Sequence, residues 1–520
     1  DFSAYDFKEH IRYAKLDMAE LQQFFLPYPN KQLDLGSEAS ALGTVYLNNF
    51  NANGVNGKWW IGKSKISTSI GDLKIAQTYS IDEWEDGFNS HPFQSDSAAF
   101  QLLNFDLGKL INLSDIGIVN GAISFKNFTW FKGSPEINQI NAALTNTDLL
   151  DYKYASIKIK NGQLKEESFN GLIEVDDKNL DVSINGKVNY GAKPSYSLDM
   201  DIKKCFLGAL GFTSVQETSL KASMSINAKS FNLSDMSGSI QINDLSYIES
   251  GRDLKVPYAK VIIERGKTSD LLDIESSLGN IRIDGKVNPS TVGQDFMHEL
   301  AKIFPTAGTH LSMSNGEVQN KFTYSIEIKD LSDFLPIFLP ELSIESGTIV
   351  KGMFDSGSNK LELNLNANKI IFDSMVFEGI DLDQKVDRSG ILAEYNISKF
   401  NYSDSLAFSD VHFKSKGSKG DLESELSWDP NTSNYSKLSW ETLILENDYL
   451  DFKLKPSFIS YSTQKYNSYQ YSVFFKSFTS GRPFFIYSNS NPFGSSKINI
   501  PQQLSLKYVF FCSNPFGFGT

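Results

Sequence analysis

The sequence predicts an all-β protein, folded as an elongated, strongly curved antiparallel sheet with a few short helices. Three observations support this fold class. Apolar and polar residues alternate with a period of two in runs along most of the chain. Dipeptides typical of tight turns recur among these runs. Aromatic residues make up 13% of the 520 residues, 39 of them Phe, whereas only 16 are Pro, a composition that favours strands.

The alternating runs each combine one apolar and one polar face. Successive side chains of a strand point to opposite sides of the sheet, so the apolar members of a run share one side. The sequence therefore predicts an apolar face lined by Leu180, Val182, Ile184, Leu220, Ala222, Met224, Ile226, Leu272, Ile274, Phe322, Tyr324, Ile326, Ile328, Leu361, Leu363 and Leu365.

Seven dipeptides contain residues that tolerate a positive φ and are typical of two-residue hairpin turns. They predict that the strands follow one another as an antiparallel meander. The dipeptides are Asn56-Gly57, Asn120-Gly121, Asn161-Gly162, Asn170-Gly171, Asn185-Gly186, Asp284-Gly285 and Asn315-Gly316.

Short apolar helices interrupt the strands at intervals, each following a strand that ends near Asp. Asp17 with Glu20 forms a capping box, and Asp330 precedes a similar segment. We predict a repetitive β-groove region over residues 1–455 and an unassigned β-rich tail over 456–520. The expected helices lie near residues 18–26, 107–112, 205–211, 295–304 and 331–339.

The N-terminal segment has an alternative interpretation as one longer helix. Its apolar residues are spaced three and four apart, as on one face of a helix. These residues are Phe7, Ile11, Ala14, Met18, Leu21 and Phe25.

Composition excludes several classes of function. Asp and Glu number 62 against 49 Lys and Arg, and the formal net charge of -13 repels a phosphate backbone, so nucleic acid is not an expected partner. No stretch approaches 18 consecutive apolar residues, so the residues given are not expected to span a membrane. Two cysteines, Cys205 and Cys512, leave open one disulfide or two unpaired thiols.

The sequence lacks a convincing catalytic or metal-binding motif. His298-Glu299 begins like a zincin motif, but Lys302 takes the place of the second His. Asp176 and Asp177 lie in a segment typical of a turn, so the pair is interpreted as structural. We therefore expect neither an enzyme nor a metal or cofactor. The histidines are scattered: His10, His91, His298, His310 and His412.

A one-sided sheet must bury its apolar face against another layer. The expected helices are too few and short to cover it, and no linker divides the chain into sandwich modules. The remaining solution is a curved sheet whose apolar face lines a trough. Such a trough suits lipid acyl chains, because apolar burial is favourable by about 0.8 kcal/mol per methylene and needs no directional bonds.

Four segments carry a resemblance, which covers most of residues 10–450, to the AsmA-like proteins and, within them, to the TamB family of translocation and assembly module subunits in the form found in Bacteroidetes. They are FDLGKLINLSDIGIVNGAISF (105–125), FNGLIEVDDKNLDVSINGKV (169–188), SFNLSDMSGSIQINDLSYI (230–248) and LLDIESSLGNIRIDGKVNPS (271–290).

The resemblance implies a β-taco groove in the periplasm, between the inner and outer membranes of a Gram-negative bacterium. It implies phospholipid as cargo, outer-membrane biogenesis as the role, and an Omp85-family barrel protein as partner. The family's N-terminal membrane anchor and C-terminal TamB domain are missing from this sequence. This leaves direct contact with the barrel open and predicts that the chain is a segment of a larger protein.

Two other functions fit a long β protein. A scaffold or chaperone for outer-membrane barrels would pair its strand edges with nascent strands. A surface adhesin or carbohydrate-binding protein would stack sugars on Trp59, Trp60 and Trp130. Lipid transport along the apolar trough is the function that the sequence favours over these two alternatives.

Overall fold

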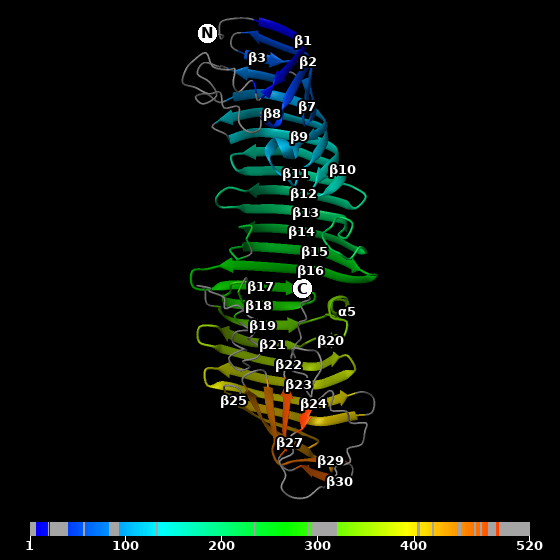
Figure 1. Cartoon of the computed structure of the whole chain (residues 1–520), viewed down its shortest axis with the longest axis vertical. Coiled ribbons are helices and arrows are strands. Elements are labelled where there is room, and N and C mark those ends of the chain that lie inside the picture. The colour runs from blue at the N-terminus through cyan, green and yellow to red at the C-terminus, as the bar shows by residue number, and fades with distance from the viewer. Residues whose placement is uncertain are drawn as a thin grey trace.

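The chain folds as one long antiparallel sheet, which is not closed into a barrel, in a computed structural model (Figure 1). Most strands lie across the long axis and follow one another along it from the N-terminus, whereas the orange C-terminal strands run nearly along that axis. The prediction of an all-β antiparallel sheet is confirmed. The structure describes residues 7–18, 20, 40–55, 58–77, 79–82, 93–131, 134–232, 234–289, 291–292, 295, 320–402, 406–418, 421–445, 449–461, 464–468, 471–476 and 485–487.

The first half of the sheet reaches from the N-terminal edge to the middle of the molecule. Its strands are β1 (Phe7–Asp17), β2 (Thr44–Val55), β3 (Lys58–Ile61), β4 (Ser64–Thr68), β5 (Gly71–Gln77), β6 (Tyr79–Asp82), β7 (Phe93–Asp106), β8 (Ile118–Phe131), β9 (Ser134–Leu149), β10 (Tyr152–Lys165), β11 (Ser168–Asp176), β12 (Leu180–Asn189), β13 (Ser195–Phe206), β14 (Thr218–Lys229), β15 (Ser237–Glu249) and β16 (Arg252–Arg265).

The second half continues the same pattern. Its strands are β17 (Asp270–Ser276), β18 (Gly279–Lys286), β19 (Lys321–Ile328), β20 (Leu342–Ile344), β21 (Ile349–Asp355), β22 (Lys360–Phe372), β23 (Met375–Asp387), β24 (Gly390–Tyr402), β25 (Leu406–Ser418), β26 (Asp421–Trp428), β27 (Ser436–Leu445), β28 (Tyr449–Leu454), β29 (Ser457–Tyr461), β30 (Gln464–Ser468), β31 (Tyr471–Lys476) and β32 (Phe485–Tyr487).

Strands β7 to β19 pair strictly in sequence order, and so do β21 to β28. The short strand β20 lies beside β22, so β19 pairs directly with β21. Hairpin connections therefore fall alternately on two long edges of the sheet. We call one edge the helix rim, formed by the connections after β7, β9, β11, β13, β15, β17, β19 and β22. The other edge is the opposite rim.

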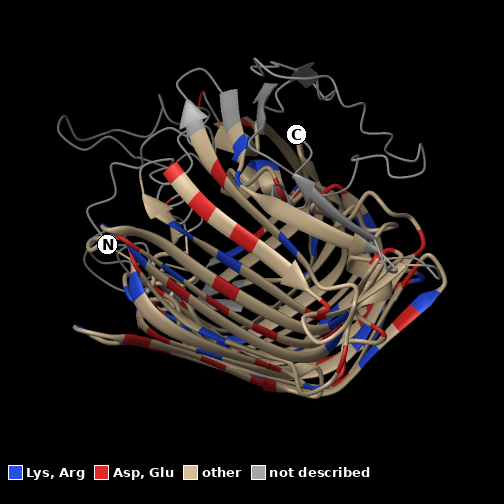
Figure 2. Ribbon diagram, turned by 90° about the horizontal axis from the view of Figure 1, so that it is seen from below, with Lys and Arg blue, Asp and Glu red and all other residues tan. Residues whose placement is uncertain are grey.

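The sheet is curved, as a view along its long axis shows (Figure 2). Residues with left-handed backbone conformation lie inside long strands and bend them, as β-bulges do. Neighbouring strands satisfy the backbone at these corners: the Asn104 N–H donates to Asn120 Oδ1 at 2.7 Å, and the Asn161 N–H donates to Asn141 Oδ1 at 3.0 Å. The left-handed corner residues include Asn49, Asn104, Asn127, Asn146, Asn161, Asp244, Gly379 and Asp410.

A corner also shifts the alternation of side chains by one residue. Along β22 the apolar positions are two residues apart up to Ala367 and resume at Ile370, three residues later. The shift coincides with Gly379 (φ 60°) on β23 and Asp410 (φ 46°) on β25. Each strand therefore presents a new set of residues to the apolar side after the bend.

The predicted turn positions are wrong for five of the seven dipeptides. Asn120-Gly121, Asn161-Gly162, Asn170-Gly171, Asn185-Gly186 and Asp284-Gly285 lie inside β8, β10, β11, β12 and β18. Asn and Gly favour positive φ both in turns and at strand bends, so the dipeptide alone does not distinguish them. Asn56-Gly57 and Asn315-Gly316 lie outside the described residues.

The hairpin between β9 and β10 shows what replaces Asn-Gly. Leu149 pairs with Tyr152, and the two intervening residues, Leu150 and Asp151, have φ of 51° and 59°. Both central residues of a two-residue turn of this kind need positive φ. The prediction of an antiparallel meander is therefore correct, although five of the dipeptides on which it was based do not form its turns.

Two helices are described over their whole length, both on the helix rim: α3 (Leu107–Ile111) and α5 (Leu335–Phe338). They fall within the predicted 107–112 and 331–339 segments. The helix expected near 205–211 is wrong, because β13 extends to Phe206 and turns follow, with a hydrogen bond from Phe212 N–H to Leu207 O of 2.9 Å. Most of 18–26 and 295–304 lies outside the described residues.

The alternative of a long N-terminal helix is wrong, because residues 7–17 form β1. Its residues pair with β2 over most of the strand, from Phe7 opposite Gly54 to Asp17 opposite Thr44. Pairing with a neighbouring strand overrides the helical spacing of the apolar residues.

Candidate functional site

The sixteen predicted apolar residues all lie on one face of the sheet. They come from β12, β14, β17, β19 and β22, and the strands between them supply the partners that connect them. Ile184 lies opposite Met200, and Met200 lies opposite Met224. Because directly opposed residues share a face, the register places the separate runs on one surface.

One row of this face crosses fourteen successive strands without a polar residue other than a tyrosine. At about 4.8 Å per strand it extends roughly 60 Å. Its members are Leu198, Ile226, Ile240, Val261, Ile274, Ile281, Ile326, Val350, Leu365, Leu382, Tyr395, Phe413, Leu426 and Leu438.

The predicted residues are only partly shielded from solvent. Val182, Ala222 and Leu361 are buried, with 6%, 4% and 5% of their surface exposed. The other thirteen are half-buried. A sealed interior would bury nearly all of them, so the face retains apolar surface that a further molecule can cover.

Buried clusters lie at separate places along the apolar face. One contains Tyr154, Ile157, Val182, Ile202 and Leu210, and the last of these comes from the turns after β13. Two smaller clusters centre on Val119 and on Phe354. Within the described residues, other parts of the protein therefore cover the apolar face at these clusters. Between the clusters the face stays partly exposed.

Tyr324 is the most polar of the sixteen predicted residues. Its hydroxyl donates to the backbone oxygen of Glu362, two strands away, at 3.0 Å, and burial raises its pKa. The side chain passes over Gly352, where an added Cβ would lie 2.4 Å from the Tyr324 hydroxyl oxygen. Its polar atom is satisfied by the sheet, so the ring presents apolar surface.

Beyond β22 the apolar face becomes aromatic, which the sequence analysis missed. Tyr395 and Phe413 have ring centroids 5.3 Å apart, and the series continues through Trp440 at 6.1 Å to Phe452 at 5.7 Å. The signal was present as period-two spacing within each strand. Only the register shows that these rings are neighbours.

The other face of the sheet is polar. Lys160 and Glu174 pair at 2.7 Å, and Lys437 and Glu425 pair at 2.8 Å. The hydrogen bond from Lys160 lowers the pKa of the Glu174 carboxyl. These pairs are exposed and belong to a surface that faces water.

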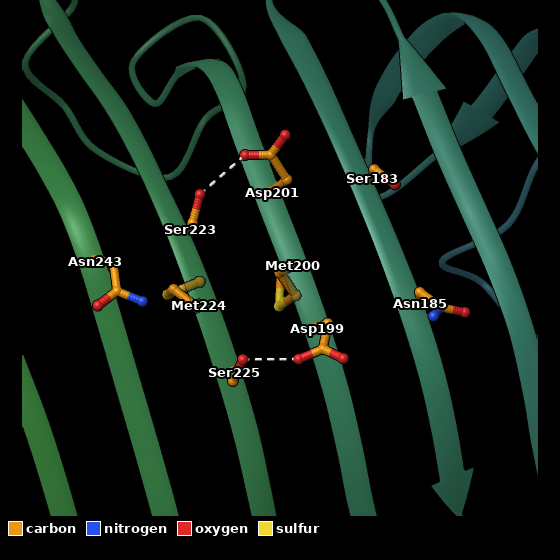
Figure 3. A pocket seen from close by; sticks show the side chains of 9 residues that line it. All are labelled: Ser183, Asn185, Asp199, Met200, Asp201, Ser223, Met224, Ser225 and Asn243. Carbon is orange, nitrogen blue, oxygen red and sulfur yellow. Dashed lines mark hydrogen bonds between the residues drawn. The ribbon is translucent and has the colours of Figure 1, made fainter.

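A shallow hollow of about 270 Å³ lies on this polar face (Figure 3). Ser223 Oγ donates to Asp201 Oδ1 at 3.1 Å, and Ser225 Oγ donates to Asp199 Oδ1 at 2.7 Å. Met200 and Met224 also line it, but their opposed register places their side chains on the apolar face. The hollow is polar and open, so it does not resemble a site for an apolar cargo.

Of the two neighbouring carboxylates, Asp176 and Asp177, the second stabilises a turn. Asp177 is buried and accepts hydrogen bonds from the Tyr152 hydroxyl at 2.7 Å, the Asn179 N–H at 2.9 Å and the Ala155 N–H at 3.0 Å. Burial alone would raise its pKa, but these bonds together lower it. Asp176 is exposed.

The described histidines lie apart on separate strands. His10 Nδ1 is 2.6 Å from Asn51 Oδ1, and His412 Nδ1 is 2.6 Å from Asn396 Oδ1. His91, His298 and His310 lie outside the described residues. In the part of the chain that the structure describes, no group of three or more His, Cys, Asp or Glu side chains is placed to hold a metal ion.

Cys205 is a buried thiol whose pKa is raised by burial, and Cys512 lies outside the described residues. The side chains of Trp59, Trp60 and Trp130 also lie outside them, so the carbohydrate-binding alternative gains no support. Among the helices described, none is long and apolar enough to cross a membrane.

In comparisons with known proteins, no family model, no curated protein and no solved structure matches the chain. The likeness to the AsmA-like proteins stays a prediction from the four sequence segments.

Proposed function

We propose that this chain carries lipid along the apolar face of its sheet, shielding acyl chains from water. The observation that carries the proposal is the unbroken apolar row from Leu198 to Leu438, which joins half-buried residues of many strands. Each methylene covered by such a surface contributes about 0.8 kcal/mol, and aliphatic contacts impose no fixed position along the row. An acyl chain can therefore slide from strand to strand.

The row favours a conduit over a compact receptor. A receptor for one small ligand encloses most of the ligand in a pocket with a few convergent polar groups. Here the apolar surface is long, open and repetitive, and the described polar groups on it, such as the Tyr324 hydroxyl, already have protein partners. The proposed role is binding and transfer, with no catalytic step.

The cellular setting in this proposal rests on the family resemblance. It is a bridge in the periplasm of a Gram-negative bacterium, moving phospholipid toward the outer membrane during its biogenesis. The implied partners are an Omp85-family barrel protein and the inner membrane.

A photocrosslinking amino acid at Met224 tests the face that carries lipid. Met224 is half-buried on the apolar face, whereas its neighbours Ser223 and Ser225 lie on the polar face of the same strand. We expect phospholipid adducts at Met224 and almost none at the two serines, measured by mass spectrometry after purification from membranes. Equal capture at all three positions contradicts the proposal.

Native mass spectrometry with lipid extraction checks the cargo itself. The purified chain is expected to release phospholipid. A chain that is free of lipid and instead captures unfolded outer-membrane barrels would favour the scaffold function over transport.

A further inference from the structure

The two rims of the sheet differ in the side chains they expose. Large apolar side chains are exposed at many points of the helix rim, from the end of β7 to the end of β22, a span of roughly 65 Å at the usual strand spacing. The most exposed are Leu113 at 53%, Leu150 at 53%, Phe212 at 62%, Phe338 at 48% and Leu339 at 49%.

Three insertions carry most of these side chains, and the sheet holds each in place. Residues 107–117 are closed by the hydrogen bond from Leu107 N–H to Gly117 O at 3.2 Å. Residues 207–217 are closed by the Leu207 N–H to Thr218 O at 2.9 Å, and residues 329–348 by the Ile328 N–H to Thr348 O at 2.8 Å. The apolar exposure therefore belongs to ordered backbone.

Each insertion also touches the apolar face with its inner side. Leu107 and Leu110 pack on the cluster around Val119. Leu210, which is 7% exposed, belongs to the cluster with Val182. Each of these insertions thus combines an inner apolar contact with an outer exposed apolar side.

The insertion that contains α5 contacts a strand well away from the one it follows. The Phe338 ring stacks on Tyr247 of β15 with centroids 6.1 Å apart, although α5 follows β19. Tyr247 lies opposite Leu220, one of the predicted lining residues. At all three insertions, apolar surface therefore continues from the sheet face to the outside of the rim (α5 is visible at the right in Figure 1).

The opposite rim ends in ion pairs. Asp270 binds Arg265 at 3.3 Å and Lys286 at 2.9 Å, and its register places it in the row with Phe322 on the apolar face. Farther along this rim, Lys321 pairs with Asp355 at 3.0 Å. An acyl chain that crossed here would strip water from charges, which is costly.

The exposed apolar residues of the opposite rim are fewer among those described. They are Tyr190, Leu392 and Phe231, and the last of these stacks on Tyr196 at 5.4 Å. The helix rim around α5 also carries Asp330, Asp333 and Glu345, which would repel an anionic bilayer lying flat against it. Single lipid chains suit this rim better than a membrane surface.

We propose that lipid chains enter and leave the apolar face across the helix rim. The exposed apolar side chains of the three insertions provide the surface over which the chains pass. This inference rests on the proposed lipid-carrying function. The headgroup stays in water outside the rim while the acyl chain passes over Phe212 or Phe338.

The test is transfer of a fluorescent phospholipid from donor to acceptor phosphatidylcholine vesicles by the full chain. The rim variant combines Phe212→Ser with Phe338→Ser, and the control combines Tyr190→Ser with Leu392→Ser on the opposite rim. We expect the rim variant to transfer roughly tenfold more slowly, a barrier increase of about 1.4 kcal/mol, and the control to transfer at the normal rate. Bound lipid per chain should be unchanged in both.

A second rim variant, Leu113→Gln with Leu150→Gln, guards against a local folding defect near α5 and should slow transfer in the same direction. Normal transfer by both rim variants, with normal lipid content, would overturn the rim assignment and leave the lipid-carrying function standing. Absence of bound lipid in the unaltered chain would overturn both.

Discussion

At the scale of single residues, polar side chains in this sheet serve the backbone. Asp177, in the turn between β11 and β12, accepts hydrogen bonds from the Asn179 N–H of that turn and from the Ala155 N–H and the Tyr152 hydroxyl of β10. Asn120 and Asn141 accept the N–H groups of corner residues on neighbouring strands. From sequence alone, such Asp and Asn residues suggest catalytic sites or hairpin turns. In this sheet they accept hydrogen bonds from the backbone and have a structural role.

Asp177→Ala is expected to destabilise this turn by about 2–3 kcal/mol, because buried donors lose their acceptor. Hydrogen exchange at the Ala155 and Asn179 amides measures the loss. Asp176→Ala changes an exposed neighbour and should leave both amides protected. Equal loss in the two variants would contradict the assigned role.

The same carboxylate gives these amides a pH dependence. The pKa of Asp177 is lowered on folding, so its stabilising contribution is fully present above the ordinary value of 3.8 and is lost as pH falls through the lower folded value. The protection of the Ala155 amide in the unaltered chain should therefore decline only below about pH 4.

At the scale of elements, glycines determine where strands approach and bend. Gly186 in β12 has φ of 147°, and a Cβ there would lie 2.0 Å from the Ser197 backbone oxygen of β13. Gly121 and Gly285 occupy equivalent positions, with the nearest backbone oxygen 2.2 Å from an added Cβ. These glycines explain why Asn-Gly and Asp-Gly occur inside strands.

Gly186→Val is expected to disrupt the pairing of β12 with β13 around Ser197 and Leu198. Strained backbone and a clash with the neighbouring strand should together cost about 2–4 kcal/mol. Hydrogen exchange along β13 reports the change. Lys187→Val, which places the same side chain at an exposed neighbouring position, should leave β13 protected, and disruption by both would point to another cause.

At the scale of the whole molecule, transport along a row depends on its continuity. Ile326 lies near the middle of the row, between Ile281 and Val350. A single charge there interrupts the path for every acyl chain that must pass, whereas binding on either side remains.

Ile326→Asp is therefore expected to lower vesicle-to-vesicle transfer roughly tenfold while removing only part of the bound lipid, because an acyl chain does not compensate a desolvated carboxylate. Ser325→Asp introduces the same charge on the polar face of the same strand and should transfer normally. Similar loss in both variants would argue against a path confined to the apolar face.

Much of this fold was predictable because period-two alternation is a local property. The runs around Met224, Ile326 and Leu365 showed from the sequence alone that strands have one apolar side, and the structure places all sixteen predicted residues on a common face. The antiparallel meander was also predicted, but from seven dipeptides of which five lie inside strands.

The tertiary structure decided the register, the corners and the rims. Pairing register depends on residues of neighbouring strands, so the row through Tyr395 and Phe413 and the contact between Phe338 and Tyr247 emerge only once the strands are aligned. Asn and Gly adopt positive φ readily, and both hairpin turns and bends inside strands need it. At Gly186 the pairing with neighbouring strands determines that the residue lies inside a strand and not in a turn. The class of structure was thus encoded along the chain, whereas the continuous surface on which the proposed function depends arises between strands.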